Sequence, residues 1–140
     1  MTNFKSKERS LARENTLKVF YQHDINQYPF SDITKSFIEK RSFDEDYFNN
    51  IIELYELNTV KINNFIEENT DILLKSLTPI DRSILRIAIC ELMYREDIPR
   101  KVILNESINI AKKYSSKESY KFINIILDKL VSVMKKNDKK

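Results

Sequence analysis

The stretch TPIDRSILRIAICEL, residues 78–92, decides the fold class. Thr78 is a favoured N-cap residue, Pro79 fits the first helical position, and Asp81 places a negative charge at the positive end of the helix dipole. Behind this start, apolar residues recur at three- and four-residue spacing: Ile84, Leu85, Ile87, Ala88 and Leu92. The stretch therefore predicts a buried helix that ends near Asp97-Ile98-Pro99.

The flanking segments repeat the helical pattern in both directions. We expect helices over about 5–26, 72–77 and 99–113. A short helix should follow Ser31, which is its N-cap. Two further helices should begin at capping boxes, one of Ser42 with Glu45 and one of Ser115 with Glu118. The segment that follows Ser42 is either one long helix or two shorter ones. Because no segment alternates with period two, the sequence predicts an all-α, single compact bundle of six to seven helices. One domain spans 1–140, with frayed basic ends at 1–5 and 135–140.

The composition excludes several familiar chemistries. The 140 residues include no glycine, which argues against a P-loop or a dinucleotide-binding loop. One cysteine and one histidine cannot build a structural zinc site or a disulfide framework, so we expect no metal and no cofactor. A catalytic triad would depend on the single histidine, so the usual catalytic residues are missing although an enzyme is not excluded. Cys90 is expected in the core, and His23 in a structural role. An enzyme is the least favoured interpretation.

No apolar run approaches the ~18 residues of a membrane-spanning helix, and the N-terminus lacks a signal-peptide core. We therefore expect a cytoplasmic protein without a membrane partner.

Charge is distributed unevenly along the chain. Residues 1–13 carry four bases and one acid, residues 44–71 carry eight acids and one base, and residues 100–140 carry eleven bases and four acids. If the basic ends fold together, they would attract a polyanion, and the acidic middle would repel it or bind a basic partner. The alternative is that these charges are scattered over a solvated surface.

Four blocks of sequence carry a family resemblance. They are LRIAICEL at 85–92, IPRKVILNE at 98–106, SYKFINIILDK at 119–129, and Ala12-Arg13-Glu14 followed by Val19-Phe20-Tyr21-Gln22. In this order, the chain resembles the NusB family of bacterial transcription antitermination factors over nearly its whole length. The resemblance implies an all-helical fold of two small bundles that share a long central helix, and no catalytic activity.

The same resemblance implies partners. NusB-like proteins bind the boxA element of nascent ribosomal RNA leaders, which is single-stranded RNA, together with a small-subunit ribosomal protein that doubles as the factor NusE. The complex loads onto RNA polymerase and suppresses premature termination, and some members form homodimers. The family motifs place RNA contacts at Lys5, Lys7, Arg9, Arg13, Tyr21, Lys121 and Phe122, and a contact with the ribosomal protein at Asp81. Ile125 and Leu54 stand where the family has glycine, and both are expected to fill space at helix contacts.

Elementary chemistry supports the RNA interpretation. Lysine and arginine neutralise phosphates and release counterions, so about four to six such contacts make affinity fall by orders of magnitude as salt rises. Tyr21 and Phe122 could each stack an unpaired base. The alternative is a non-RNA-binding helical protein–protein adaptor whose basic ends aid solubility and whose aromatic residues belong to the core. Removing charge at Arg9, Arg13 and Lys121 separates the two interpretations.

Overall fold

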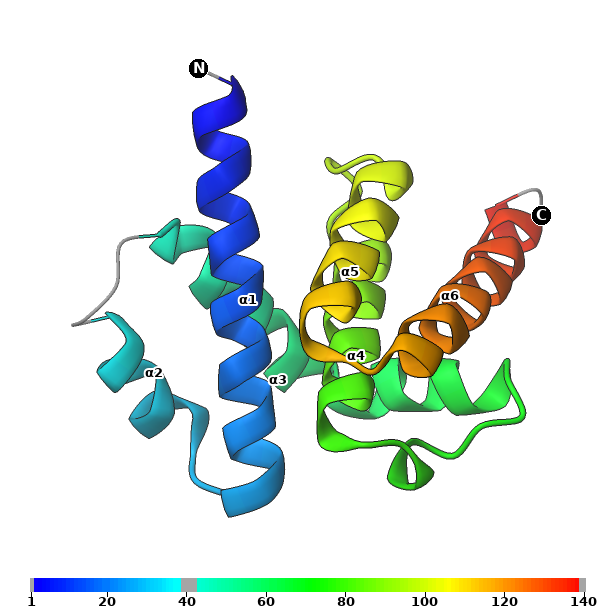
Figure 1. Cartoon of the computed structure of the whole chain (residues 1–140), viewed down its shortest axis with the longest axis horizontal. Coiled ribbons are helices and arrows are strands. Elements are labelled where there is room, and N and C mark those ends of the chain that lie inside the picture. Colours follow the sequence, from blue (N-terminus) through cyan, green and yellow to red (C-terminus); the bar gives the residue numbers. More distant parts are fainter. Residues whose placement is uncertain (1, 39–42, 139–140) are drawn as a thin grey trace.

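The computed structural model describes residues 2–38 and 43–138 and, within them, the side chains of 6–37 and 43–138. These residues form α1 (Thr2–Asn26), α2 (Phe30–Ile38), α3 (Glu45–Glu68), the 3₁₀ turn η1 (Leu74–Ser76), α4 (Pro79–Tyr94), α5 (Arg100–Tyr114) and α6 (Lys117–Asp138), as Figure 1 shows. No strand is present in the described part of the chain, so the predicted all-α class is confirmed. None of the helices described is both long enough and apolar enough to cross a membrane.

Helix α4 joins the two halves of the protein. It packs against α1 and α3 on the N-terminal side and against α5 and α6 on the C-terminal side, while α2 packs on α1 (Figure 1). Its 16 residues make it shorter than α1, α3 and α6. The helix that α1 and α3 share with α5 and α6 is therefore α4, which is central in position but is not the longest helix.

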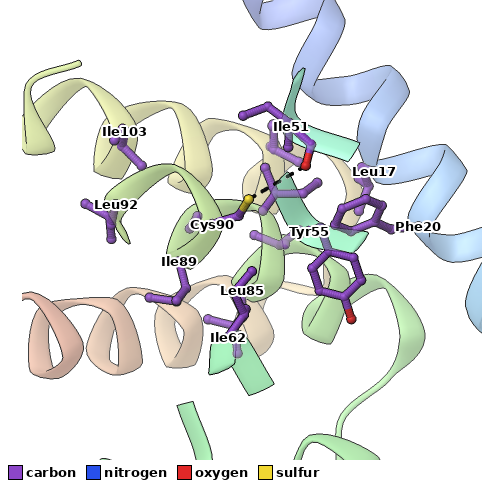
Figure 2. Close-up of a cluster of buried hydrophobic side chains, with 14 of the residues drawn as sticks. Leu17, Phe20, Ile51, Tyr55, Ile62, Leu85, Ile89, Cys90, Leu92 and Ile103 are labelled. Carbon is purple, nitrogen blue, oxygen red and sulfur yellow. Dashed lines mark hydrogen bonds between the residues drawn. The ribbon is translucent and has the colours of Figure 1, made fainter. Parts of the chain in front are cut away.

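The core is built around the apolar face of α4. Leu85, Ile89 and Cys90 are fully buried, and they pack among side chains from the neighbouring helices, as the close-up in Figure 2 shows. The Cys90 thiol donates a weak hydrogen bond to the Ile51 carbonyl at 3.7 Å. Burial, followed by the nearby Glu91 charge, raises the pKa of Cys90 to about 12. Cys90 is thus the core residue that the sequence predicted.

The start of α4 is formed as its sequence predicts. Thr78 is the N-cap, and its hydroxyl accepts a hydrogen bond from the Asp81 amide at 3.1 Å. The helix ends at Tyr94, one turn before the predicted Asp97-Ile98-Pro99 stop. The Arg95 amide still donates to the Glu91 carbonyl, at 2.8 Å, although its backbone has left the helical region.

Other helix starts differ from the prediction by one or two residues. Asp44 rather than Ser42 caps α3, accepting from the Tyr47 amide at 3.1 Å, and Ser42 lies outside the described residues. Ser116 rather than Ser115 accepts from the Ser119 amide at the start of α6. Several short polar residues stand together at each boundary, and the sequence alone does not choose among them. Ser31 lies inside the first turn of α2, and the predicted helix at 72–77 is reduced to η1.

Two further expectations concerned helix continuity and packing. The segment behind Asp44 is one helix, α3, with a non-helical residue, Asn58 (φ −130°, ψ 22°), near its middle.

Ile125 is 67% exposed, so the expectation that it fills a helix contact is wrong. Leu54 is partly buried and packs against the core. Helix α1 extends to Thr2 and α6 to Asp138, through segments that were expected to fray.

Candidate nucleic-acid interface

The N-terminal turns of α1 carry the first group of predicted RNA contacts. Lys7 is exposed and has no ion-pair partner among the described residues. Arg9 is partly exposed; its guanidinium lies 3.8 Å from the Asp44 carboxylate and 4.9 Å from the centre of the Tyr47 ring. Lys5 belongs to α1, but its side chain lies outside the described part. Lys7 and Arg9 are therefore cations at the surface, of which only Arg9 has a neighbouring acid.

Arg13 lies inside the protein, in a cluster of polar groups from four helices. Its Nε and Nη2 donate to the two Glu91 carboxylate oxygens at 2.9 Å each, and its Nη1 donates to Glu106 at 3.2 Å. Nη2 also donates to the Tyr47 hydroxyl at 2.7 Å, and that hydroxyl donates in turn to Glu91. The Ser10 hydroxyl donates to Glu106. The cluster thereby joins α1, α3, α4 and α5.

This cluster stabilises the charged form of Arg13. Burial disfavours the cation, but the hydrogen bonds and charge of Glu91 outweigh burial and raise the pKa of Arg13 above its ordinary value. Burial, followed by the Glu91 charge, raises the pKa of the Tyr47 phenol, so it stays protonated and can donate. Because the Arg13 side chain is only 4% exposed, a phosphate would reach its guanidinium only if this cluster opened. Its evident contribution is to fix α1 against the other helices.

The second group of predicted contacts lies elsewhere. Lys121 and Phe122 are exposed near the start of α6, and Tyr21 is 37% exposed on α1. Tyr21 lies about 18 Å along the helix axis from Arg9, because a helix rises ~1.5 Å per residue. In Figure 1, α5 lies between α1 and α6. Lys121 and Phe122 therefore lie on a different helix from Lys7, Arg9 and Tyr21, and Tyr21 lies more than three helical turns from Arg9.

Asp81 was predicted to contact a protein partner, and the structure places it at a buried helix start. It is 6% exposed, and one of its carboxylate oxygens accepts from the Ser115 hydroxyl at 2.7 Å. The next residues toward the surface are Arg82 and Arg86, both of which pair with Asp24 of α1. Any partner at this end of α4 would meet these arginines as well as the edge of Asp81.

Sequence reasoning missed a groove between α1 and α5. It has a volume of about 230 Å³ and is lined by Ser10, Glu14, Glu106, Asn109, Ile110 and Lys113. Glu14 was read only as part of a motif, and Glu106 likewise. Sequence reasoning also missed the buried pair of Arg13 and Glu91, for which a partial signal was present: Glu91 follows Ile87 and Ala88 by four and three residues, on the buried face of its helix. A buried carboxylate needs a cation, and Arg13 is that cation.

His23 lies in a structural environment, as the sequence predicted. His23 stacks on Phe30, with ring centres 4.0 Å apart, and its Nδ1 lies 2.8 Å from the Tyr28 carbonyl oxygen. Within 2–38 and 43–138, no three histidine, cysteine, aspartate or glutamate side chains are grouped as a metal ion would require.

Comparison with known proteins gives consistent results. A sequence model described as the NusB family matches residues 10–132. The chain is 40% identical to the transcription antitermination protein NusB of Clostridium novyi (strain NT), over 88% of this chain and 97% of that protein. It is 31% identical to the protein of the same name from Escherichia coli (strain K12 / DH10B), over 94% and 96% of the two chains.

Solved structures share the fold. The NusB of T. maritima matches with a TM-score of 0.78 at 29% identity, over 89% of this chain and 90% of that one. A chain from a crystal structure of the antitermination factors NusB and NusE in complex with dsRNA matches with a TM-score of 0.83 at 19% identity, over 91% of this chain and 98% of that one.

Proposed function

The chain belongs to the NusB family of transcription antitermination proteins, and on that premise we propose that it binds the boxA RNA of nascent ribosomal RNA transcripts together with a small-subunit ribosomal protein acting as NusE. The observation that carries the proposal is the family match over residues 10–132. The bound complex acts on RNA polymerase and lets it read through terminators. The protein works in the cytoplasm as a non-catalytic scaffold, with no cofactor.

The surface chemistry supports an RNA interface. Lys7 on α1 and Lys121 on α6 are exposed cations with no acid partner among the described residues, so each can neutralise a phosphate without first breaking an ion pair. Phe122 and Tyr21 expose apolar rings on which an unpaired base can stack. Arg9 is a third cation, but its guanidinium lies 3.8 Å from the Asp44 carboxylate, so a phosphate would compete with Asp44 for it.

Arg13 has a different part in this proposal. Its guanidinium makes five hydrogen bonds of 3.2 Å or less within the protein. We infer that Arg13 positions α1 for the RNA and does not itself contact the RNA. The protein partner is placed at the start of α4, where the edge of Asp81 lies beside Arg82 and Arg86, both paired with Asp24. Glu68 and Asp71 are exposed acids of the acidic segment 44–71, and they could bind a basic protein partner.

The test is a fluorescence anisotropy titration of a boxA RNA and a scrambled RNA of equal composition, over a salt series. With three phosphate contacts on single-stranded RNA, from Lys7, Arg9 and Lys121, the slope of log affinity against log salt should be about −2.1. The boxA RNA should bind more tightly than the scrambled RNA at every salt concentration. Equal, weak binding of both RNAs would reject RNA recognition and favour a protein–protein adaptor.

A further inference from the structure

We propose that the groove between α1 and α5 binds one unpaired guanine base of the RNA. The inference rests on the proposed function, because it names the base that this site would take. The groove of about 230 Å³ combines carboxylates, an amide and an ammonium group over the buried Ile110. Small-molecule pockets typically span about 300–1,000 Å³, so a groove of this size suits a fragment such as a single base.

Two carboxylates in the groove have unused acceptor capacity. Oε1 of Glu14 accepts from the Lys113 ammonium at 2.6 Å and from the Tyr114 hydroxyl at 2.9 Å. Oε1 of Glu106 accepts from Ser10 and from Arg13. The Oε2 atoms of both glutamates have no donor among the described residues, and the Asn109 amide has no partner there either. The groove therefore presents acceptors that its own helices leave unfilled.

Guanine is the base that matches this arrangement. Its Watson–Crick edge presents two adjacent donors, N1–H and N2–H, beside the O6 acceptor, and the two lone pairs of the free Glu14 Oε2 can accept from both donors. Adenine and cytosine present one amine next to an acceptor nitrogen, and uracil presents one N–H between two carbonyls. Those acceptors would face a carboxylate and repel it. The Asn109 amide N–H or the Lys113 ammonium can donate to O6.

The surrounding charges let a polyanion approach these acids. Lys113 lines the groove and is 62% exposed along its side chain, and Lys112 is exposed beside it on α5. Lys7 lies one turn before Ser10 on α1 and is exposed. Phosphates on either side of the base would contact these cations, while the free Oε2 atoms of the two glutamates would accept from the base edge.

The experiment uses a boxA RNA in which each guanosine is replaced in turn by inosine, which lacks the N2 amine. At one position, inosine should weaken binding to the unaltered protein by about 5- to 150-fold, the range of one bidentate base contact. Glu14→Gln should weaken binding of the guanosine RNA and make the same inosine replacement harmless. Glu53→Gln, which removes an exposed acid on α3, is the matched control and should keep the sensitivity to inosine.

A second pair of variants keeps the test independent of Glu14, which also contacts Tyr114. Asn109→Ala should weaken the guanosine RNA, whereas Asn105→Ala, an exposed asparagine one turn earlier on α5, should not. The proposal is overturned if RNA binds selectively but Glu14→Gln and Asn109→Ala lower affinity no more than their controls, or if inosine sensitivity persists in both. Failure of the unaltered protein to bind any RNA would instead reject the proposed function.

Discussion

Replacing Arg13 with glutamine should be among the most destabilising single changes in this protein. The substitution leaves Glu91, whose side chain is 1% exposed, as a buried carboxylate without its cation. Removing one partner of a buried pair costs about 3–5 kcal/mol. A domain of this size has roughly 5–15 kcal/mol of stability in total. The expected fall in melting temperature is roughly 10–20 °C.

The assay is urea unfolding followed by helical circular dichroism, with the melting temperature measured in parallel. Arg100→Gln is the matched control: its partner Asp138 is 61% exposed along the side chain, so losing that pair should cost less than about 1 kcal/mol. The double variant Arg13→Met with Glu91→Leu removes both buried charges and should be more stable than Arg13→Gln alone. If Arg13→Gln unfolds within about 1 kcal/mol of the unaltered protein, the cluster does not hold α1 as the structure indicates.

Three further predictions concern the helix cap, the thiol and the RNA surface. Thr78→Ala removes the hydroxyl that accepts from the Asp81 amide and should lower the free energy of unfolding by about 1 kcal/mol in the same urea assay, while Thr78→Asp should preserve it. Cys90 has a pKa of about 12, so at pH 8 its thiolate is scarce and a thiol reagent should label it slowly in the native protein and rapidly in urea; rapid native labelling would contradict its burial. Lys7→Gln and Lys121→Gln should each make the slope of log affinity against log salt shallower by about 0.7, because each removes one phosphate contact. The control Lys61→Gln, on the acidic face of α3, should leave the slope unchanged. If Lys7→Gln and Lys121→Gln also leave the slope unchanged, these two lysines do not contact the RNA.

Local signals in the sequence predicted elements better than their boundaries. The Thr78-Pro79 start predicted α4 because the cap, the proline and the acid all favour the same residue as the start. At α3 and α6, neighbouring serines and aspartates compete for the cap, and tertiary packing selects Asp44 and Ser116. The helix expected at 72–77 shrank to η1, since an apolar run alone does not fix a helix.

Side-chain exposure was harder to predict than helix position. Arg13 was predicted to contact RNA because it matches a family motif, but its partners, the buried Glu91 and the partly buried Glu106, lie 78 and 93 residues further along the chain. Ile125 was predicted to fill a helix contact because it stands where the family has glycine, but its side chain on α6 is exposed to solvent. Both outcomes depend on which faces of distant helices meet, which no local pattern contains. The groove between α1 and α5 was missed for the same reason.

The measurement that tests the account most directly is the thermodynamic coupling between RNA and protein partner. The boxA RNA is titrated with and without saturating NusE, and NusE is titrated with and without saturating RNA. The account predicts that each partner tightens the other by the same factor, about 5- to 150-fold, because linkage is reciprocal. Equal affinities in the presence and absence of the other partner, with no preference for boxA over scrambled RNA, would contradict a shared RNA-binding surface.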